Sequence, residues 1–273
     1  MQEQSIFSIG KTERHPNVRT DILLIMDTPT EAYEKLLKEA QGDPKIIGLV
    51  FGSSRGKDNQ FLTEHSDYDV IVVLVDDASQ ELKDHLKMYE SEKFELWPKT
   101  ITEFKEHARW GTADDWDRYN YTHNKAVIDK TGEIQKIIDG KGGLPTEVQK
   151  DFVENALDAY INSVYRSAKY WRDGNEFAAH VDASESLPYL MTALYALEGR
   201  LKPYNKYFVW ELKNHPLKLL PWSVDGFISD YKKILVAGDI KTQGKIYTAV
   251  KKLFQNQGYG KTVEGWKGKY FVG

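Results

Sequence analysis

Cysteine is absent from this chain of 273 residues. Disulfide bonds, thiolate metal sites and cysteine nucleophiles are therefore excluded together. Long apolar runs are absent as well, because none approaches the roughly 18 residues that a membrane-spanning helix needs. The polar start, from Met1 to Arg14, contains no apolar core of the kind that signal peptides have. From these absences we expect a cytoplasmic protein with no membrane partner.

An excess of basic residues is also missing. The sequence has 37 Lys and Arg against 41 Asp and Glu, which gives a net charge of −4. A dedicated nucleic-acid-binding domain usually carries a clear basic excess, so nucleic acid is not expected as the main partner. What the chain does have is the apolar content of an ordinary globular protein, 41%, which is enough for a substantial core.

The first half of the sequence alternates β-rich runs with helical patterns. Ile46 to Phe51 predicts a strand, and the almost continuously apolar Asp69 to Val75 predicts a central strand buried on both faces. Two further strands are predicted at residues 93–97, where Pro98 ends the run, and at residues 126–129. Helices are predicted over residues 27–41 and 79–91.

Helical periodicity alone fills the second half. The Gly-rich residues 140–145 predict a boundary that divides the chain into one domain of residues 1–143 and another of residues 144–273. Strands with helices first, and helices only afterwards, indicate an α+β fold: a mixed sheet flanked by helices, followed by an all-α bundle. The helices predicted in the second half cover residues 146–172, 177–201, 206–213, 224–236 and 243–256.

A glycine-serine turn follows the first predicted strand. Gly52 has no Cβ, so its backbone can come close to a phosphate group. Ser53 and the amides after it, at Ser54 and Arg55, can donate hydrogen bonds to phosphate oxygens. The sequence therefore predicts a phosphate-binding turn at these four residues.

Two carboxylates stand at the entry to the central strand. Asp67 and Asp69 are two residues apart on an extended segment, so their side chains project from the same face. Carboxylates placed in this way would repel each other unless a cation lay between them, and oxygen ligands are those that Mg²⁺ prefers. Two such ions, about 3.5–4 Å apart, would activate an attacking hydroxyl and neutralise charge on a reacting phosphate.

The combination of turn and carboxylates is more specific than either part. Its parts, in order, are an apolar strand, Gly52-Ser53, thirteen residues, and Ser66-Asp67-Tyr68-Asp69 entering a buried strand. This arrangement resembles the signature of the nucleotidyltransferase superfamily, which includes DNA polymerase β and the antibiotic nucleotidyltransferases. The resemblance covers roughly residues 27–132. It implies magnesium-dependent nucleotidyl transfer from ATP or another nucleoside triphosphate.

The family usually has a third carboxylate on a neighbouring strand, near the metal ions and able to act as a base. Glu95 stands within the predicted strand at residues 93–97, between apolar residues, where an inward carboxylate would need a partner. Asp129 ends a later strand, in a turn context where aspartate is common for structural reasons. We take Glu95 as the third catalytic and metal-binding residue, with Asp129 as the alternative.

The second half resembles, more loosely, the helical domain of small-molecule nucleotidyltransferases. Its landmark is the segment from Ala193 to Phe208, which resembles a helix followed by Pro-x-x-Lys-aromatic. By this likeness Lys206 reaches the triphosphate as a point charge on a flexible stem. Acidic residues on a helix of such relatives hold a cationic substrate, which points to Asp182 and Glu185. A solvated helix face explains these two residues equally well.

The expected activity is transfer of AMP, or another nucleoside monophosphate, to a hydroxyl of a small molecule such as an aminoglycoside or lincosamide antibiotic. Two alternatives stay open. The Lys-rich residues 232–269 would suit nucleotide transfer to a protein or to an RNA end. A toxin–antitoxin-type binding protein of the same fold would bind without catalysis. Both a monomer and a homodimer are compatible with the sequence.

Overall fold

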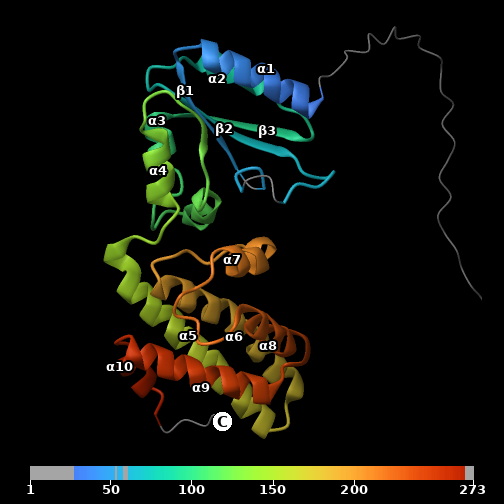
Figure 1. Ribbon diagram of the computed structural model, residues 1–273, viewed down its shortest axis with the longest axis vertical. Helices are drawn as coiled ribbons and strands as arrows, with labels where there is room; N and C mark the ends of the chain where they lie inside the picture. The colour runs from blue at the N-terminus through green and yellow to red at the C-terminus, as the bar shows by residue number, and fades with distance from the viewer. Residues whose placement is uncertain (1–27, 53, 58–60, 268–273) are drawn as a thin grey trace, which may run out of the picture.

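A mixed sheet with helices on both faces forms one part of the molecule, and helices alone form the other (Figure 1). The computed structural model describes residues 28–52, 54–57 and 61–267; Asp27, the start of the predicted opening helix, and Ser53 lie outside them. The sheet order is β3-β2-β1-β4, with β1 antiparallel to both neighbours and β2 parallel to β3. The strands are β1 (Ile46–Phe51), β2 (Tyr68–Leu74), β3 (Phe94–Thr100) and β4 (Ala126–Asp129).

Different helices cover the two faces of the sheet, as Figure 1 shows. On one face α1 (Pro29–Gly42) and α2 (Gln80–Lys87) bury their apolar sides against the strands. The other face is covered by α3 (Ile101–Glu106), α4 (Ile134–Lys141) and the 3-10 helix η1 (Asp115–Tyr121). The sheet is thus the middle layer between two separate apolar clusters.

Side chains of β2 alternate between these two clusters. Val70 and Val72 point to the α1 side, whereas Ile71 and Val73 point to the α3 side. Residues two apart on a strand share a face, so Asp69 lies on the same face as Ile71. The start of β2 therefore presents Asp69 on the side of the sheet where η1 packs.

In the second part of the chain, all regular elements of the described residues are helices, joined by turns and loops. Pro188 lies inside α6, and the helix continues through it. In the part of the chain that the structure describes, no helix is both long and apolar enough to span a membrane. The elements are α5 (Thr146–Arg172), α6 (Glu176–Leu197), η2 (Asn205–Tyr207), α7 (Phe208–Asn214), α8 (Val224–Ala237), α9 (Ile240–Asn256) and α10 (Gly260–Glu264).

The α+β fold class predicted from the sequence is confirmed. The predicted strands at residues 46–51 and 126–129 and the helix at 146–172 have the predicted bounds. The prediction that Pro98 ends the third strand is wrong, since β3 runs on to Thr100. β3 is an edge strand, and an edge strand tolerates proline because one side of its backbone pairs with no neighbour. The short helices α3, α4 and η1 were not predicted.

Side chains also join the two parts. Tyr119 belongs to the apolar cluster of the helical part, and Trp110 packs against it. Glu211 on α7 accepts hydrogen bonds from the Tyr119 hydroxyl at 2.6 Å and from His123 at 3.0 Å. The predicted boundary at residues 140–145 begins in the last turn of α4 and ends at the residue before α5; the division into two domains stays a prediction.

Candidate active site

Gly52 and Asp69 lie against each other where β1 ends and β2 begins. The Gly52 amide donates to the Asp69 carbonyl oxygen at 2.7 Å, which extends the β1–β2 ladder by one residue. A Cβ at position 52 would stand only 3.2 Å from the Asp69 Cβ. Glycine at this position therefore allows the turn to approach the carboxylate-bearing residue closely.

Glu95 is the register partner of Asp69 on the neighbouring strand. β2 and β3 are parallel, with Asp69 opposite Glu95 and Ile71 opposite Trp97. Adjacent strands lie about 4.8 Å apart, and partners in register point to the same face, so the two acidic residues are neighbours there. Asp67 comes one residue before β2 and is partly buried. Their catalytic and metal-binding roles stay predictions.

A cavity of about 400 Å³ opens beside Asp69. Sites for small molecules commonly have volumes of about 300–1,000 Å³. Its lining combines aromatic with charged and polar side chains, whereas Glu95 is exposed and lies outside the lining. The sheet contributes Asp69, Trp97 and Lys99 to the lining, and η1 contributes Trp116, Asp117 and Tyr121.

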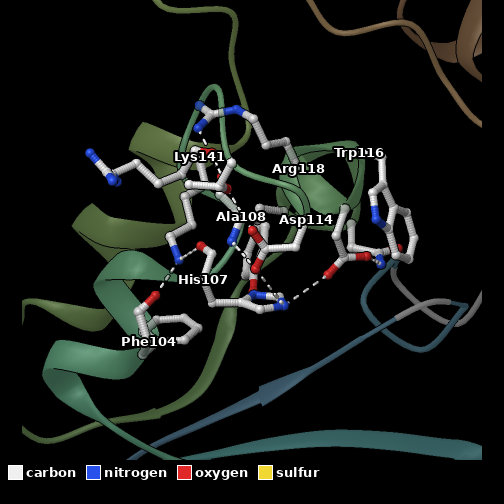
Figure 2. Close-up of polar contacts among 12 residues, drawn as sticks. Phe104, His107, Ala108, Asp114, Trp116, Arg118 and Lys141 are labelled. Carbon is white, nitrogen blue, oxygen red and sulfur yellow. Dashed lines mark hydrogen bonds and ion pairs between the residues drawn. The ribbon is translucent and has the colours of Figure 1, made fainter.

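His107 lines the same cavity between a tyrosine and two carboxylates. Its Nδ1 lies 2.8 Å from the Tyr121 hydroxyl, and its Nε2 lies 3.6 Å from an Asp117 oxygen and 3.9 Å from an Asp114 oxygen. Figure 2 shows His107 beside Asp114, with the Lys141 ammonium bonded to the His107 carbonyl. These contacts fix the orientation of the imidazole.

Burial shifts the pKa values of His107 and Asp117, which both line the cavity. Burial, with the nearby charges of Lys99 and Lys141, lowers the pKa of His107 to about 4, so the imidazole is neutral at pH 7. Burial also raises the pKa of Asp117, against the opposing effect of hydrogen bonds from Asn120 and Tyr204. Perturbed pKa values of this kind are concentrated at functional sites.

The predicted phosphate-binding turn is described in part. Ser53 lies outside the described residues, and Ser54 is buried. Arg55 donates from Nε to the Asp67 carbonyl oxygen at 2.9 Å, and its guanidinium carbon lies 3.4 Å from the centre of the Tyr68 ring. Tyr68 belongs to the cluster on the α1 side. Arg55 therefore supports the backbone of Asp67 and does not line the cavity.

A buried lysine ties this turn to η1. Lys57 is 1% exposed, and its ammonium donates to the backbone carbonyls of Tyr119, Asn120 and Thr122. Lys57 is not among the residues predicted from the sequence, where its place in the turn is the only available signal. This contact links the turn after β1 to the element that carries Asp117.

The predicted substrate and phosphate residues of the helical part lie outside this cavity. Asp182 is 1% exposed, and both of its carboxylate oxygens accept hydrogen bonds from Arg166. Glu185 is exposed on the same helix, and Lys206 is exposed in η2. The structure does not bring these three predicted residues to Asp69.

Asp129, the alternative third carboxylate, holds a turn together. It accepts hydrogen bonds from the backbone amides of Thr131 at 3.2 Å, Gly132 at 2.7 Å and Gln135 at 3.0 Å. Burial alone would raise the pKa of Asp129, but these amide donors lower it. Asp129 is the last residue of β4 and closes the turn that leads to α4, which is a structural role away from the cavity lining.

The carboxylates at the start of β2 and β3 have the donor chemistry that suits magnesium. Mg²⁺ is usually held by one or two protein carboxylates, with water and phosphate oxygens completing its shell. Within residues 28–52, 54–57 and 61–267, no three His, Asp or Glu side chains are grouped so as to hold an ion by themselves. Asp69 and Glu95, which are register partners, match the carboxylate part of such a shell; that they and Asp67 bind magnesium stays a prediction.

Comparison with known proteins yields little beyond this geometry. No family model matches the chain, and no curated protein matches it. Among solved structures, the chain is similar to the nucleotidyltransferase-like protein from Exiguobacterium sibiricum, with 12% sequence identity and a TM-score of 0.40. That match covers 86% of this chain and 74% of the other. A likeness at this level does not establish a family.

Proposed function

We propose that this chain is a nucleotidyltransferase that moves a nucleoside monophosphate, with AMP from ATP as the expected case, to a hydroxyl of a small molecule. One observation carries the proposal. Asp69 and the strand-end Gly52 border a cavity large enough for a small-molecule substrate, and Glu95 is the register partner of Asp69 on the neighbouring strand. The order of glycine turn and paired aspartates in the sequence supports the same reading.

In this proposal, the acidic residues at the starts of β2 and β3 bind magnesium. Asp69 and Glu95 supply carboxylate oxygens from neighbouring strands. Asp67, two residues before Asp69, adds a third carboxylate on the same face. When bound, magnesium supplies positive charge that stabilises the negative charge of the reacting phosphate. The backbone at Gly52, which carries no side chain, can approach the phosphate groups.

The cavity supplies the place for the acceptor. Trp97 is 41% exposed and Trp116 is 68% exposed, and both border it. Such indole faces favour a ring-bearing acceptor, to which polar groups of the same cavity can add hydrogen bonds. Aminoglycosides and lincosamides are the acceptors we propose to test first.

The reaction breaks two bonds, the acceptor O–H bond and a bond of the α-phosphorus, and forms two, the acceptor O–P bond and the bond between the proton and its base. The acceptor oxygen attacks the α-phosphorus of the nucleotide and loses its proton to a base. The bond from the α-phosphorus to the bridging oxygen breaks, and pyrophosphate leaves with the electron pair. Positioning and electrostatic stabilisation provide most of the rate enhancement in phosphoryl-type transfers.

A screen for pyrophosphate release tests the proposal. The wild-type protein is incubated with magnesium, each nucleoside triphosphate in turn, and a panel of aminoglycosides, lincosamides, tRNA and oligonucleotides. We expect acceptor-dependent release that falls at least about 1,000-fold in Asp69→Asn, because several kcal/mol of charge stabilisation is lost. Asp84→Asn, an exposed residue of α2, is the matched control with unchanged activity. Equal rates in Asp69→Asn and the wild type would contradict the proposal.

The same screen separates the alternatives. Release that requires tRNA or oligonucleotide, and that falls steeply with salt, would favour transfer to an RNA end. A protein fraction is added to the panel as a further acceptor, and release that requires this fraction would favour modification of a protein partner. Binding of ATP without release under any condition would favour a non-catalytic binding protein.

A further inference from the structure

Asp117 borders the same cavity as Asp69 but comes from a different element. Asp69 begins β2, whereas Asp117 lies in η1, which packs on that face of the sheet. The Asp117 side chain is 16% exposed, so it is largely enclosed while still bordering the cavity. A ligand in the cavity would lie between the two aspartates.

The surroundings of Asp117 orient its carboxylate. Oδ1 accepts hydrogen bonds from the Asn120 amide and, at 3.4 Å, from the Tyr204 hydroxyl of the helical part. Oδ2 faces Nε2 of His107 at 3.6 Å. When the Tyr121 hydroxyl donates to Nδ1 of a neutral His107, the ring proton lies on Nε2 and points toward this oxygen.

The charges around Asp117 come from several elements. Asp114 on the preceding turn raises its pKa further, and Lys141 on α4 lowers it. Lys99 of β3 lines the same cavity. Among the described residues, no Lys or Arg forms an ion pair with Asp117; its nearest basic group is the neutral imidazole of His107, 3.6 Å away. Burial thus makes Asp117 a better proton acceptor than an exposed aspartate, because desolvation penalises the ionised form.

We propose that Asp117 is the catalytic base that accepts the proton of the acceptor hydroxyl, and that His107 and Tyr204 position it. This inference rests on the proposed nucleotidyl transfer and assigns a residue that the sequence did not single out. Glu95 is exposed and does not line the cavity, so we assign it to magnesium binding and not to the role of the base. The acceptor O–H bond breaks, the proton goes to Asp117, and the oxygen forms its bond to the α-phosphorus as pyrophosphate departs.

Asp117→Asn is the direct test. A positioned general base contributes about 100- to 10,000-fold, so we expect kcat to fall at least about 100-fold while the KM for nucleotide changes less than about twofold. The acid limb of the wild-type pH–rate profile should disappear in Asp117→Asn, and Asp117→Glu should restore part of the rate. Asp115→Asn is the matched control, since Asp115 is in the same 3-10 helix and lies outside the cavity lining.

The outcomes separate this inference from the proposed function. An active wild type, an inactive Asp69→Asn and an Asp117→Asn with the wild-type rate and pH profile would overturn the assignment of Asp117 alone. A wild type that releases no pyrophosphate with any nucleotide and acceptor would overturn both proposals. Each result is read on protein whose thermal unfolding matches that of the wild type.

A second measurement does not depend on activity. The side-chain carboxyl carbons of the full-length wild-type protein are labelled at aspartate and titrated by NMR, and through-bond correlation to the assigned wild-type backbone identifies the Asp117 signal. We expect Asp117 to titrate above the ordinary value of about 3.9. Titration at or below that value would overturn the inference even if Asp117→Asn were too unstable to assay.

Discussion

Acids shielded from solvent occur in both parts of the molecule, fully buried in the helical part and partly buried in the sheet part, and their neighbours differ. In the helical part each is held by a basic side chain, whereas Asp69 and Asp117 in the sheet part border a cavity of about 400 Å³. Burial of an acid therefore does not by itself mark a functional site; what it faces decides its role. The pairs of the helical part are Asp182–Arg166, Glu211–Arg200 and Asp230–Lys245.

The physical reason lies in the cost of an uncompensated charge. A buried carboxylate without hydrogen bonds or a counter-charge is strongly destabilising, and removing one partner of a buried pair costs about 3–5 kcal/mol. Glu211 shows the effect clearly. Although burial raises its pKa, hydrogen bonds from His123, Tyr119 and Arg200 bring the pKa of Glu211 to about 2. Such an acid stabilises the fold, and Glu211, at 1% exposure, presents no accessible oxygen to a substrate.

The largest expected effect follows from breaking one of these pairs. Glu211→Gln should lower the free energy of unfolding by about 3–5 kcal/mol, because Arg200 loses its counter-charge and the link to Tyr119 is weakened. Urea unfolding followed by circular dichroism measures the change. Asp225→Asn, whose side chain is 86% exposed, is the control and should change stability by less than about 0.5 kcal/mol. A loss below about 1 kcal/mol in Glu211→Gln would mean that the pair is not structural.

His107, which lines the cavity, should make the free energy of unfolding depend on pH. Below pH 6.5 the unfolded chain protonates His107, whereas the folded protein does not do so until about pH 4. Between these values the unfolded state binds more protons, so stability falls as pH falls, by at most about 1.4 kcal/mol per pH unit.

His107→Gln should remove this contribution. Unfolding free energies of the wild type and His107→Gln at pH 7, 6 and 5 should converge as the pH falls. His65→Gln is the control, because the His65 side chain is 84% exposed and its removal should leave the slope unchanged. Parallel pH curves for the wild type and His107→Gln would contradict the burial of a neutral imidazole.

Asp182→Asn examines a residue that the sequence assigned to substrate. Because both Asp182 oxygens bond Arg166, which is 46% exposed and can return to water, we expect a loss of about 1–2 kcal/mol in stability. The KM for the acceptor should not change. Glu185→Gln, exposed on the same helix, should alter neither quantity. A tenfold rise in acceptor KM at unchanged stability, in either variant, would restore the substrate assignment.

The smallest effect is expected at Lys206. It is exposed in η2, so Lys206→Ala should change stability by less than about 0.5 kcal/mol. An exposed charge contributes at most about 1 kcal/mol to a single ion pair, so the KM for nucleotide should rise less than about fivefold. A larger rise would show that Lys206 does reach the triphosphate, as the sequence suggested.

Regular elements could be predicted where a long local pattern specifies them. The helix at residues 146–172 has apolar residues at helical spacing, and the strand at residues 46–51 is β-branched and apolar. Short elements could not, because α3 has six residues and its stability depends on burying Phe104 beneath the sheet. The strand end predicted at Pro98 was wrong for a related reason. Proline is tolerated within a strand that lies at an edge, and whether a strand lies at an edge is a property of the whole sheet.

The amino-acid sequence by itself determined the fold class, the glycine turn and the spacing of Asp67 and Asp69, because these depend on local propensity and on periods of two or 3.6 residues. Tertiary structure alone decided which other groups join them. It set Glu95 opposite Asp69 by strand register, brought Asp117 to the cavity through the packing of η1, and enclosed Asp182 against Arg166. Contacts between residues far apart in the chain depend on the global arrangement of apolar faces, which no short segment encodes.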